Sequence, residues 1–259
     1  MTAPLRMSTG RRVVLAVGLP VVLALIAYTG VTEVALAGQA SYPVRLAVPV
    51  HGSTVRLSAG LADVRVTQAA GSELRLTGTA HYSLIRSTVT WHPTPSGVVV
   101  TPQCHFVTGV CSFDLHAVVP DGRRALVSTG SGNVTLSGLT APVSAGTGSG
   151  DISGVTLSGP DVTLATGSGN ISITGLAGAH VVASSGSGDI ALTFTKVPAH
   201  VRVDSGSGNV TLVLPPGATR YRVNATTESG DRIITVPTGG GPQHVITVSD
   251  GSGNISITN

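Results

Sequence analysis

The sequence is poor in charged and aromatic residues, and both scarcities limit the kind of fold it can form. Only 10% of its 259 residues are charged and only 3% are aromatic. So few aromatic side chains argue against a globular core built on large rings. Its 34 glycines, together with many Val, Ile, Thr and Ser residues, favour strands and turns over helices.

The positive charge is concentrated near the N-terminus, and its position excludes one class of partner. Residues 1–37 contain Arg6, Arg11 and Arg12 against Glu33, whereas 38–259 contain twelve Lys or Arg and eleven Asp or Glu, a net charge of +1. Proteins that neutralise phosphates need a stripe of basic side chains, and this sequence has none. We therefore expect no nucleic-acid partner.

An uncharged apolar run near the N-terminus predicts export. Residues 13–31 follow Arg11 and Arg12, and a run of this length can cross a hydrocarbon core of about 30 Å with the arginines in the cytoplasm. We predict a cytoplasmic N-terminus at 1–12, a transmembrane anchor at 13–37 and a single-pass protein of the cell membrane, with 38–259 extracytoplasmic. The alternative is a signal peptide cleaved after Ala37, which would secrete the remainder.

A short signature recurs through the second half of the chain. It consists of Gly-Ser-Gly, then Asn or Asp, then a β-branched residue, and one worn copy begins with Glu228. The steps between the Asn or Asp positions are 18, 19, 19, 20, 22 and 23 residues. These positions are Asn133, Asp151, Asn170, Asp189, Asn209, Asp231 and Asn254. A period near twenty indicates that each unit is one turn of a stacked structure.

Apolar residues spaced by two flank most copies of the signature, as in Val162/Leu164 before and Ile171/Ile173 after one corner. This spacing is the side-chain period of a strand with one buried face. We therefore predict an all-β fold, a single-stranded β-solenoid (β-helix) of coils of about 19 residues at 130–259, preceded by one N-terminal transmembrane helix. The corner glycines are expected to supply positive φ angles.

The Asn and Asp side chains are expected to form a structural ladder down one edge of the stack. Strict alternation along the sequence would separate the carboxylates by about 10 Å instead of about 5 Å, which reduces their repulsion. The functional alternative is calcium binding on glycine-rich turns. The glycine-rich calcium repeat has a nine-residue period with Asp in every copy, and this chain has neither.

The region 40–129 is predicted to be a membrane-proximal β region with a disulfide-closed insertion or cap. Cys104 and Cys111 are the only cysteines, and an even number in an exported protein suggests one disulfide. The alternatives are two free thiols, or a metal site with His105 and His116. Residues 60–64 resemble a degraded first corner. At the other end, the last turn is an open edge able to pair with another copy, unless 215–242 folds over it.

No motif for catalysis or cofactor binding is present. The histidines are scattered, and the Gly-Ser-Gly units are spaced wrongly for phosphate-binding or nucleophile motifs. We predict that the protein is not an enzyme and has no catalytic residues, cofactor or metal. A β-helical enzyme acting on polysaccharides is the alternative from another functional class.

The chain resembles the bacterial "putative adhesin" family of β-strand-repeat domains of unknown function, found in cell-envelope proteins. The likeness covers about 40–259 and rests on the Gly-Ser-Gly-Asp-Ile and Gly-Ser-Gly-Asn-Val repeats, on the segment from Cys104 to Asp114, and on Leu214-Pro215-Pro216-Gly217. The resemblance implies a membrane-anchored extracytoplasmic solenoid that serves as an adhesion or binding surface, for an envelope protein or a glycan. The alternative is the sensory ectodomain of an envelope-stress system.

Overall fold

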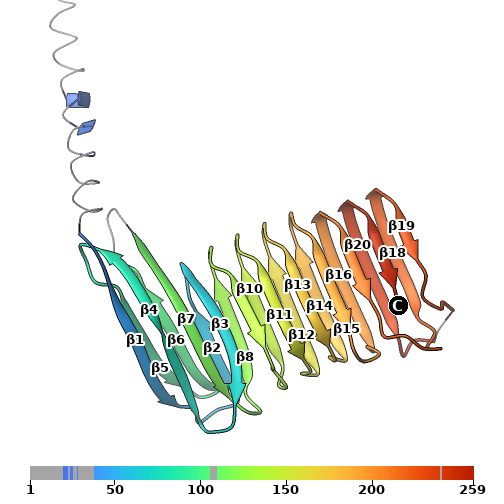
Figure 1. Cartoon of the computed structure of the whole chain (residues 1–259), viewed down its shortest axis with the longest axis horizontal. Coiled ribbons are helices and arrows are strands. Elements are labelled where there is room, and N and C mark those ends of the chain that lie inside the picture. Colours follow the sequence, from blue (N-terminus) through green and yellow to red (C-terminus); the bar gives the residue numbers. More distant parts are fainter. Residues whose placement is uncertain (1–19, 23, 26–27, 29–37, 106–109, 240) are drawn as a thin grey trace, which may run out of the picture.

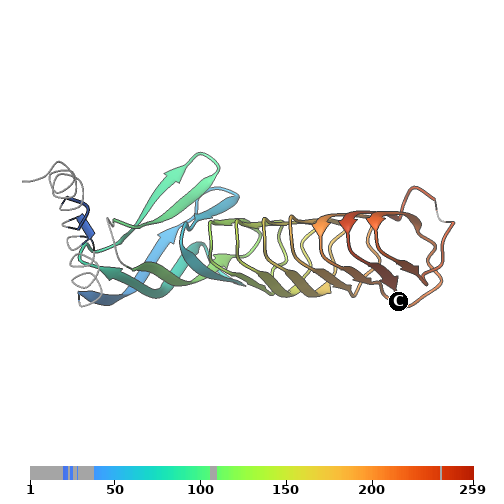
Figure 2. The ribbon, with the colours of Figure 1, turned by 90° about the horizontal axis from the view of Figure 1, so that it is seen from above.

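The computed structural model describes residues 20–22, 24–25, 28, 38–105, 110–239 and 241–259, and it is all-β (Figure 1). Seen from above, the strands form the two walls of one elongated stack (Figure 2). The predicted anchor at 13–37 lies outside the described residues, apart from 20–22, 24–25 and 28. No helix among the described residues is both long and apolar enough to cross a membrane.

The described strands form two sheets. Sheet 1 has eleven strands in the spatial order β1 (Gln39–Pro49), β4 (Glu73–Ser83), β7 (Cys111–Pro120), β3 (Ala62–Ala69), β9 (Val134–Ser137), β11 (Ile152–Leu157), β13 (Ile171–Leu176), β15 (Ile190–Phe194), β17 (Val210–Val213), β21 (Ile255–Thr258) and β19 (Arg232–Ile234). Sheet 2 has ten strands in the spatial order β18 (Arg222–Ser229), β20 (Val245–Ser252), β16 (His200–Ser207), β14 (His180–Ser185), β12 (Asp161–Thr166), β10 (Val143–Thr147), β8 (Arg124–Thr129), β2 (Thr54–Ser58), β6 (Gly97–Gln103) and β5 (Thr88–Thr94).

Each repeat unit is a coil with one strand in each sheet. In the first regular unit β8 lies in sheet 2, the corner at 130–133 turns the chain, and β9 lies in sheet 1. Neighbouring coils pair in parallel and in register, so that Ile152 is opposite Val134 and Val143 is opposite Ala125. Inside the array every strand is therefore paired on both sides. The predicted all-β stack of coils is confirmed, and each coil contributes one strand to each sheet.

The apolar positions around each corner form the core between the walls. Ile171 and Ile173 from sheet 1 and Leu164 from sheet 2 are fully buried, and Val162 is 1% exposed. The same alternation holds in most other coils, because successive side chains of a strand point to opposite faces. The core is thin and aliphatic, which explains why the repeats contain so few aromatic residues.

The spatial order of the coils differs from their order in the sequence at the C-terminal end of the stack. Strand β20 lies between β16 and β18, and β21 lies between β17 and β19. The last coil of the sequence is therefore internal, and β18 and β19 form the outer end (Figure 1). The exception stated for the open edge at the last turn is the case that holds, because β18 and β19, within 215–242, form the coil that covers it.

The same reordering occurs at the opposite end. The coil formed by β2 and β3 lies between the β6–β7 coil and the β8–β9 coil. Beyond β7, strands β4 and β1 continue sheet 1 in antiparallel orientation, and β5 pairs antiparallel with β6. Residues 40–129 and the regular repeats thus share both sheets.

Two coils depart from the regular pattern. Gly154 occupies an apolar position, and a Cβ there would lie 3.0 Å from Cδ1 of Ile173, which fills the space. In the outermost coil Arg232 pairs with Ile255, so it occupies a position that is apolar elsewhere. Its Nη1 donates a hydrogen bond to the carbonyl of Ala225 at 2.8 Å. The guanidinium thereby links the two walls at the end of the core.

Candidate binding surface

The Asn and Asp side chains of the corners form a continuous hydrogen-bonded ladder. The backbone N–H of each corner Asn or Asp donates to Oδ1 of the corner residue in the adjacent coil, for example from Asn170 to Asp151 at 2.7 Å and from Asp189 to Asn170 at 2.9 Å. Both residue types suit this role because each carries an acceptor oxygen. The N–H of Asn133 donates to Asp63 at 2.6 Å, which confirms that 60–64 form a worn first corner.

The spatial order of this ladder corrects the alternation read from the sequence. The N–H of Asn254 donates to Asn209, and the N–H of Asp231 donates to Asn254. Two asparagines are therefore neighbours, and Asp231 ends the series. The order is Asp63, Asn133, Asp151, Asn170, Asp189, Asn209, Asn254 and Asp231. An asparagine still separates each pair of carboxylates along this series.

The corner glycines are required by close backbone approach. A Cβ on Gly169 would overlap the carbonyl of Gly150, and a Cβ on Gly188 would overlap the carbonyl of Gly169. The expected positive φ is wrong for most corners, because among the corner glycines only Gly60 (31°), Gly208 (145°) and Gly230 (142°) show it. The glycines thus let adjacent corners stack at the strand spacing.

A buried column of mostly hydroxyl side chains lies just inside the corners. Thr147 Oγ1 donates to the carbonyl of Gly132 at 2.9 Å and accepts the N–H of Gly150 at 3.0 Å. Thr129 and Thr166 make the same bridge in their coils. Asp250 takes this place in the last coil of the sequence, where it is 3% exposed and neither carboxylate oxygen has a hydrogen-bond partner. These contacts make the corners structural.

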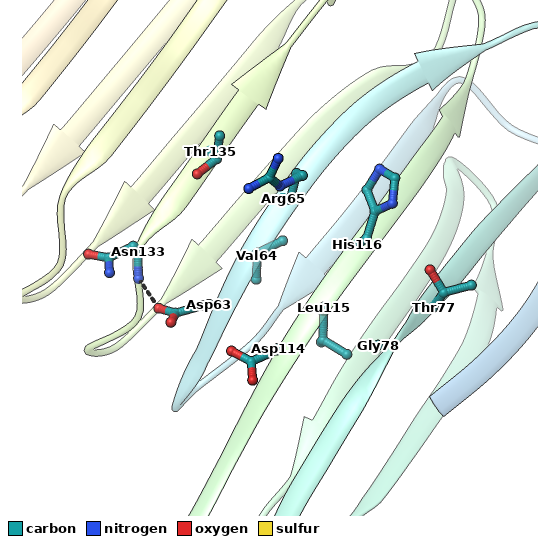
Figure 3. Close-up of a pocket in the computed structure, with 10 residues that line it drawn as sticks. All are labelled: Asp63, Val64, Arg65, Thr77, Gly78, Asp114, Leu115, His116, Asn133 and Thr135. Carbon is teal, nitrogen blue, oxygen red and sulfur yellow. Dashed lines mark hydrogen bonds between the residues drawn. The ribbon is translucent and has the colours of Figure 1, made fainter. Parts of the chain in front are cut away.

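The outer face of sheet 1 has a depression of about 430 Å³ where the stack changes from parallel to antiparallel pairing (Figure 3). Parallel pairing sets Asp63 opposite Asp114 and Arg65 opposite His116. Antiparallel pairing adds Thr77 on β4 opposite His116. Figure 3 shows the two carboxylates, the guanidinium and the imidazole on the same face. The depression therefore combines acidic, basic and neutral hydrogen-bonding groups.

Three contacts orient the polar groups of this depression. Nε2 of His116 lies 2.9 Å from Oγ1 of Thr67, and Nε2 of His81 lies 3.4 Å from Oδ2 of Asp114. Asp63 is held by the N–H of Asn133. In the ranges that the structure describes, no group of three His, Cys, Asp or Glu side chains is arranged to hold a metal ion. The depression is suited to binding a polar ligand.

Sequence reasoning did not find this cluster. The sequence places Asp63 only in a worn corner, and it places His116 only in the alternative metal site with Cys104, Cys111 and His105. Arg65 is exposed between the buried Val64 and Val66 on β3, and its position in the sequence does not show which residues surround it. Strands β4, β5 and β6 separate β3 from β7 in the sequence, so no local pattern links Asp63 to Asp114.

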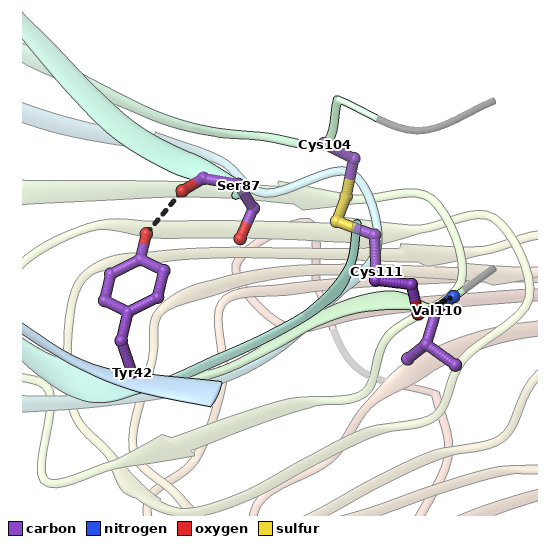
Figure 4. Close-up of a disulfide and its surroundings, with 6 residues drawn as sticks. Tyr42, Ser87, Cys104, Val110 and Cys111 are labelled. Carbon is purple, nitrogen blue, oxygen red and sulfur yellow. Dashed lines mark hydrogen bonds between the residues drawn. A yellow bond between two sulfur atoms is a disulfide. The ribbon is translucent and has the colours of Figure 1, made fainter. Parts of the chain in front are cut away.

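In the structure Cys104 and Cys111 form a disulfide whose Cα atoms are 5.9 Å apart (Figure 4). Cys111 begins β7 and is opposite Tyr82 of β4. The backbone N–H of Val110 donates to the buried Oγ of Ser83 at 3.1 Å. The disulfide loop is therefore attached to the end of β4, next to the start of β1.

Two solved structures are similar to the chain. A crystal structure of "a putative cell adhesion protein" from Clostridium sporogenes ATCC 15579 is 11% identical, with a TM-score of 0.39, and covers 85% of this chain and 99% of that chain. Another, of "a putative adhesin" from Bacteroides fragilis NCTC 9343, is 11% identical, with a TM-score of 0.43, and covers 84% of this chain and 97% of that chain. No curated protein matches the chain.

A protein-family model matches the chain directly. The model is Toastrack DUF4097, and it covers residues 123–258, which include the regular coils and all four strands, β18 to β21, of the reordered C-terminal end. This span is more than half of the chain. The protein therefore belongs to the Toastrack DUF4097 family.

Proposed function

We propose that the protein is a non-enzymatic binding surface at the cell envelope, held at the membrane by its N-terminal segment, with an envelope glycan or protein as ligand. The observation that carries the proposal is the mixed-charge depression around Arg65 and Asp114, built on neighbouring strands of sheet 1. Strands paired on both sides are rigid, so the protein loses little conformational entropy when a ligand binds there.

The groups in the depression suit a ligand that carries both carboxylate and hydroxyl groups. A guanidinium such as that of Arg65 can bind a carboxylate through two parallel hydrogen bonds. Asp114 can accept hydrogen bonds from hydroxyl or amide groups, and Thr135 can donate or accept. Cell-wall glycans with acidic substituents, and acidic loops of envelope proteins, present such groups.

The test measures retention of the full-length protein, in detergent, on isolated cell-wall glycan and on solubilised envelope proteins. Arg65→Glu and Asp114→Asn are expected to weaken retention about tenfold each, which corresponds to about 1.4 kcal/mol. Ser172→Glu is the matched control, because Ser172 is exposed on the same sheet three strands away from β3. Equal retention of all four proteins would contradict the proposal.

The bound material separates the candidate functions. Retention on glycan supports adhesion, whereas recovery of one stoichiometric membrane protein supports a sensory ectodomain. If the wild type releases soluble fragments from the glycan and Asp114→Asn does not, the protein cleaves polysaccharide, and the proposal of a non-enzymatic binding surface is wrong.

A further inference from the structure

A cluster of exposed apolar side chains lies where the stack begins. Leu84 is 53% exposed, Ile85 50% and Val110 36%, and we refer to these three residues as the apolar tip. Ser83 connects them: it precedes Leu84 in the chain, and its Oγ accepts the N–H of Val110. Ser83 is also the strand partner of Gln39, the first residue of β1. The apolar tip therefore lies beside the point where the chain enters the stack.

The turn that presents Leu84 is strained. Leu84 has a φ of 61°, and the N–H of Ile85 donates to the carbonyl of Ser83 at 2.7 Å, which closes a three-residue turn. Residues other than glycine rarely adopt such a φ, and a turn of this kind is uncommon. A strained turn that exposes two large apolar side chains is unfavourable in water alone, and such strain is concentrated at functional positions.

Neighbouring contacts hold the turn in place. The hydroxyl of Tyr42 donates to the carbonyl of Ser87 at 2.7 Å (Figure 4), and the guanidinium of Arg86 lies 4.1 Å from the centre of the Tyr42 ring. The disulfide anchors Val110 on the other side. The apolar tip is therefore a rigid part of the surface.

The length of the chain limits how far the apolar tip can lie from the membrane. Gln39 is eight positions along the chain from residue 31, where the apolar run ends. An extended chain spans at most about 3.5 Å per residue, so this segment reaches about 28 Å. If the N-terminal run spans the bilayer, as the proposed function assumes, the apolar tip is confined to the layer next to the lipid surface.

We propose that the apolar tip inserts into the interfacial layer of the bilayer that holds the anchor. Leu84, Ile85 and Val110 supply the apolar surface, and Arg86 beside them suits anionic headgroups. The stack is then attached to the membrane at two points, the N-terminal anchor and the apolar tip, and these fix its orientation relative to the lipid surface. This inference rests on the anchoring part of the proposed function and is independent of the depression on sheet 1.

The test uses the full-length protein in vesicles of phosphatidylethanolamine and phosphatidylglycerol with brominated acyl chains. In a Trp91→Phe background, which removes the only tryptophan, Ile85→Trp places a fluorescent probe at the apolar tip. Val182→Trp is the matched control, because Val182 is 38% exposed on β14 in the middle of the stack. Brominated lipid should quench Ile85→Trp strongly and leave Val182→Trp unchanged. If the tryptophan emission of Ile85→Trp is the same in brominated and in ordinary lipid, as is expected for Val182→Trp, the proposal is overturned.

A second measurement needs no substitution. Amide hydrogen exchange of the wild type is compared in vesicles and in detergent, and the peptide that covers 83–90 should be protected only in vesicles. Fast exchange of this peptide in both samples would contradict insertion, and protection in both would assign the apolar tip to a contact with a second copy or another protein. Glycan retention is measured on the same sample, so a failure of the proposed function is distinguished from a failure of insertion.

Discussion

The backbone N–H of Asn254 donates to Oδ1 of Asn209 at 3.1 Å, although 45 residues separate the two in the sequence. Asp231, which lies between them in the sequence, is placed on the far side of Asn254, where its own N–H donates to Asn254 at 2.8 Å. The outer coil thus comes first in the chain, and the last coil of the sequence lies between it and the β16–β17 coil. The neighbours of each ladder residue follow from this order and not from the sequence.

This order makes the effect of salt on ladder variants predictable. Asn170→Asp places a carboxylate between Asp151 and Asp189, whereas Asn209→Asp has only Asp189 as a charged neighbour. Each new pair about 5 Å apart costs about 1 kcal/mol or less in water and is screened by salt. Asn170→Asp should therefore lose about twice as much stability at low salt as Asn209→Asp, by thermal unfolding.

The comparison of these two variants also tests the order itself. If the coils were stacked as in the sequence, Asn209 would lie between Asp189 and Asp231, and both variants would lose equal stability at low salt. Melting shifts that do not change between low and high salt would reject the electrostatic explanation for both positions.

Asp250→Thr is expected to stabilise the protein. Thr129, Thr147 and Thr166 bridge backbone groups at the equivalent position, whereas the two oxygens of Asp250 are buried without partners. A buried polar group without a partner costs about 1–3 kcal/mol, and a threonine here can restore the bridge. Chemical denaturation should show a gain in the free energy of unfolding within that range. The reverse change in a regular coil, Thr166→Asp, should destabilise, and a loss of stability in Asp250→Thr would show that this carboxylate has a partner.

Gly169→Ala and Gly146→Ala should differ sharply in stability. The Cβ of the first would overlap the carbonyl of Gly150, whereas the Cβ of the second would meet nothing closer than the carbonyl oxygen of Ala165 at 3.8 Å. Backbone overlap in a stack paired on both sides cannot be relieved locally, so Gly169→Ala should cost about 3 kcal/mol or more. Gly146→Ala should change the free energy of unfolding by less than about 0.5 kcal/mol. Similar denaturation midpoints for both variants would disprove the close approach of Gly169 to the carbonyl of Gly150.

Tyr221→Phe is expected to protect the protein at alkaline pH. Burial raises the pKa of the Tyr221 phenol above its ordinary value of 10.0, and its hydroxyl has no hydrogen-bond partner. Below pH 10 both the folded and the unfolded chain keep the phenolic proton. Above it the unfolded chain loses the proton first, so the free energy of unfolding falls as pH rises. The phenylalanine variant has no phenol to ionise at this position, so its denaturation midpoint should decline less between pH 9 and pH 11 than that of the wild type. Parallel declines would exclude this role for the phenol.

Much of the coil architecture was predictable because it is encoded locally. The alternation of Val162 and Leu164 with polar residues predicted which side chains enter the core, and both are buried. The Gly-Ser-Gly signature predicted the corners, although close approach to the neighbouring carbonyl, rather than positive φ, explains the glycine at Gly169. The depression was not predictable, since Asp63 and Asp114 meet only through the pairing of β3 with β7.

The sequence by itself determined the unit: two strands, a glycine corner and an aliphatic core, because strand periodicity and turn chemistry depend on residues within one coil. Only the tertiary structure decided the order in which the coils stack. Coils of nearly identical shape and edge can pair with one another in any order, so the sequence contains no local signal for placing Asn254 beside Asn209. The order of the coils depends on contacts throughout the stack, in which the last coil of the sequence is paired on both sides and the coil containing Arg232 forms the end.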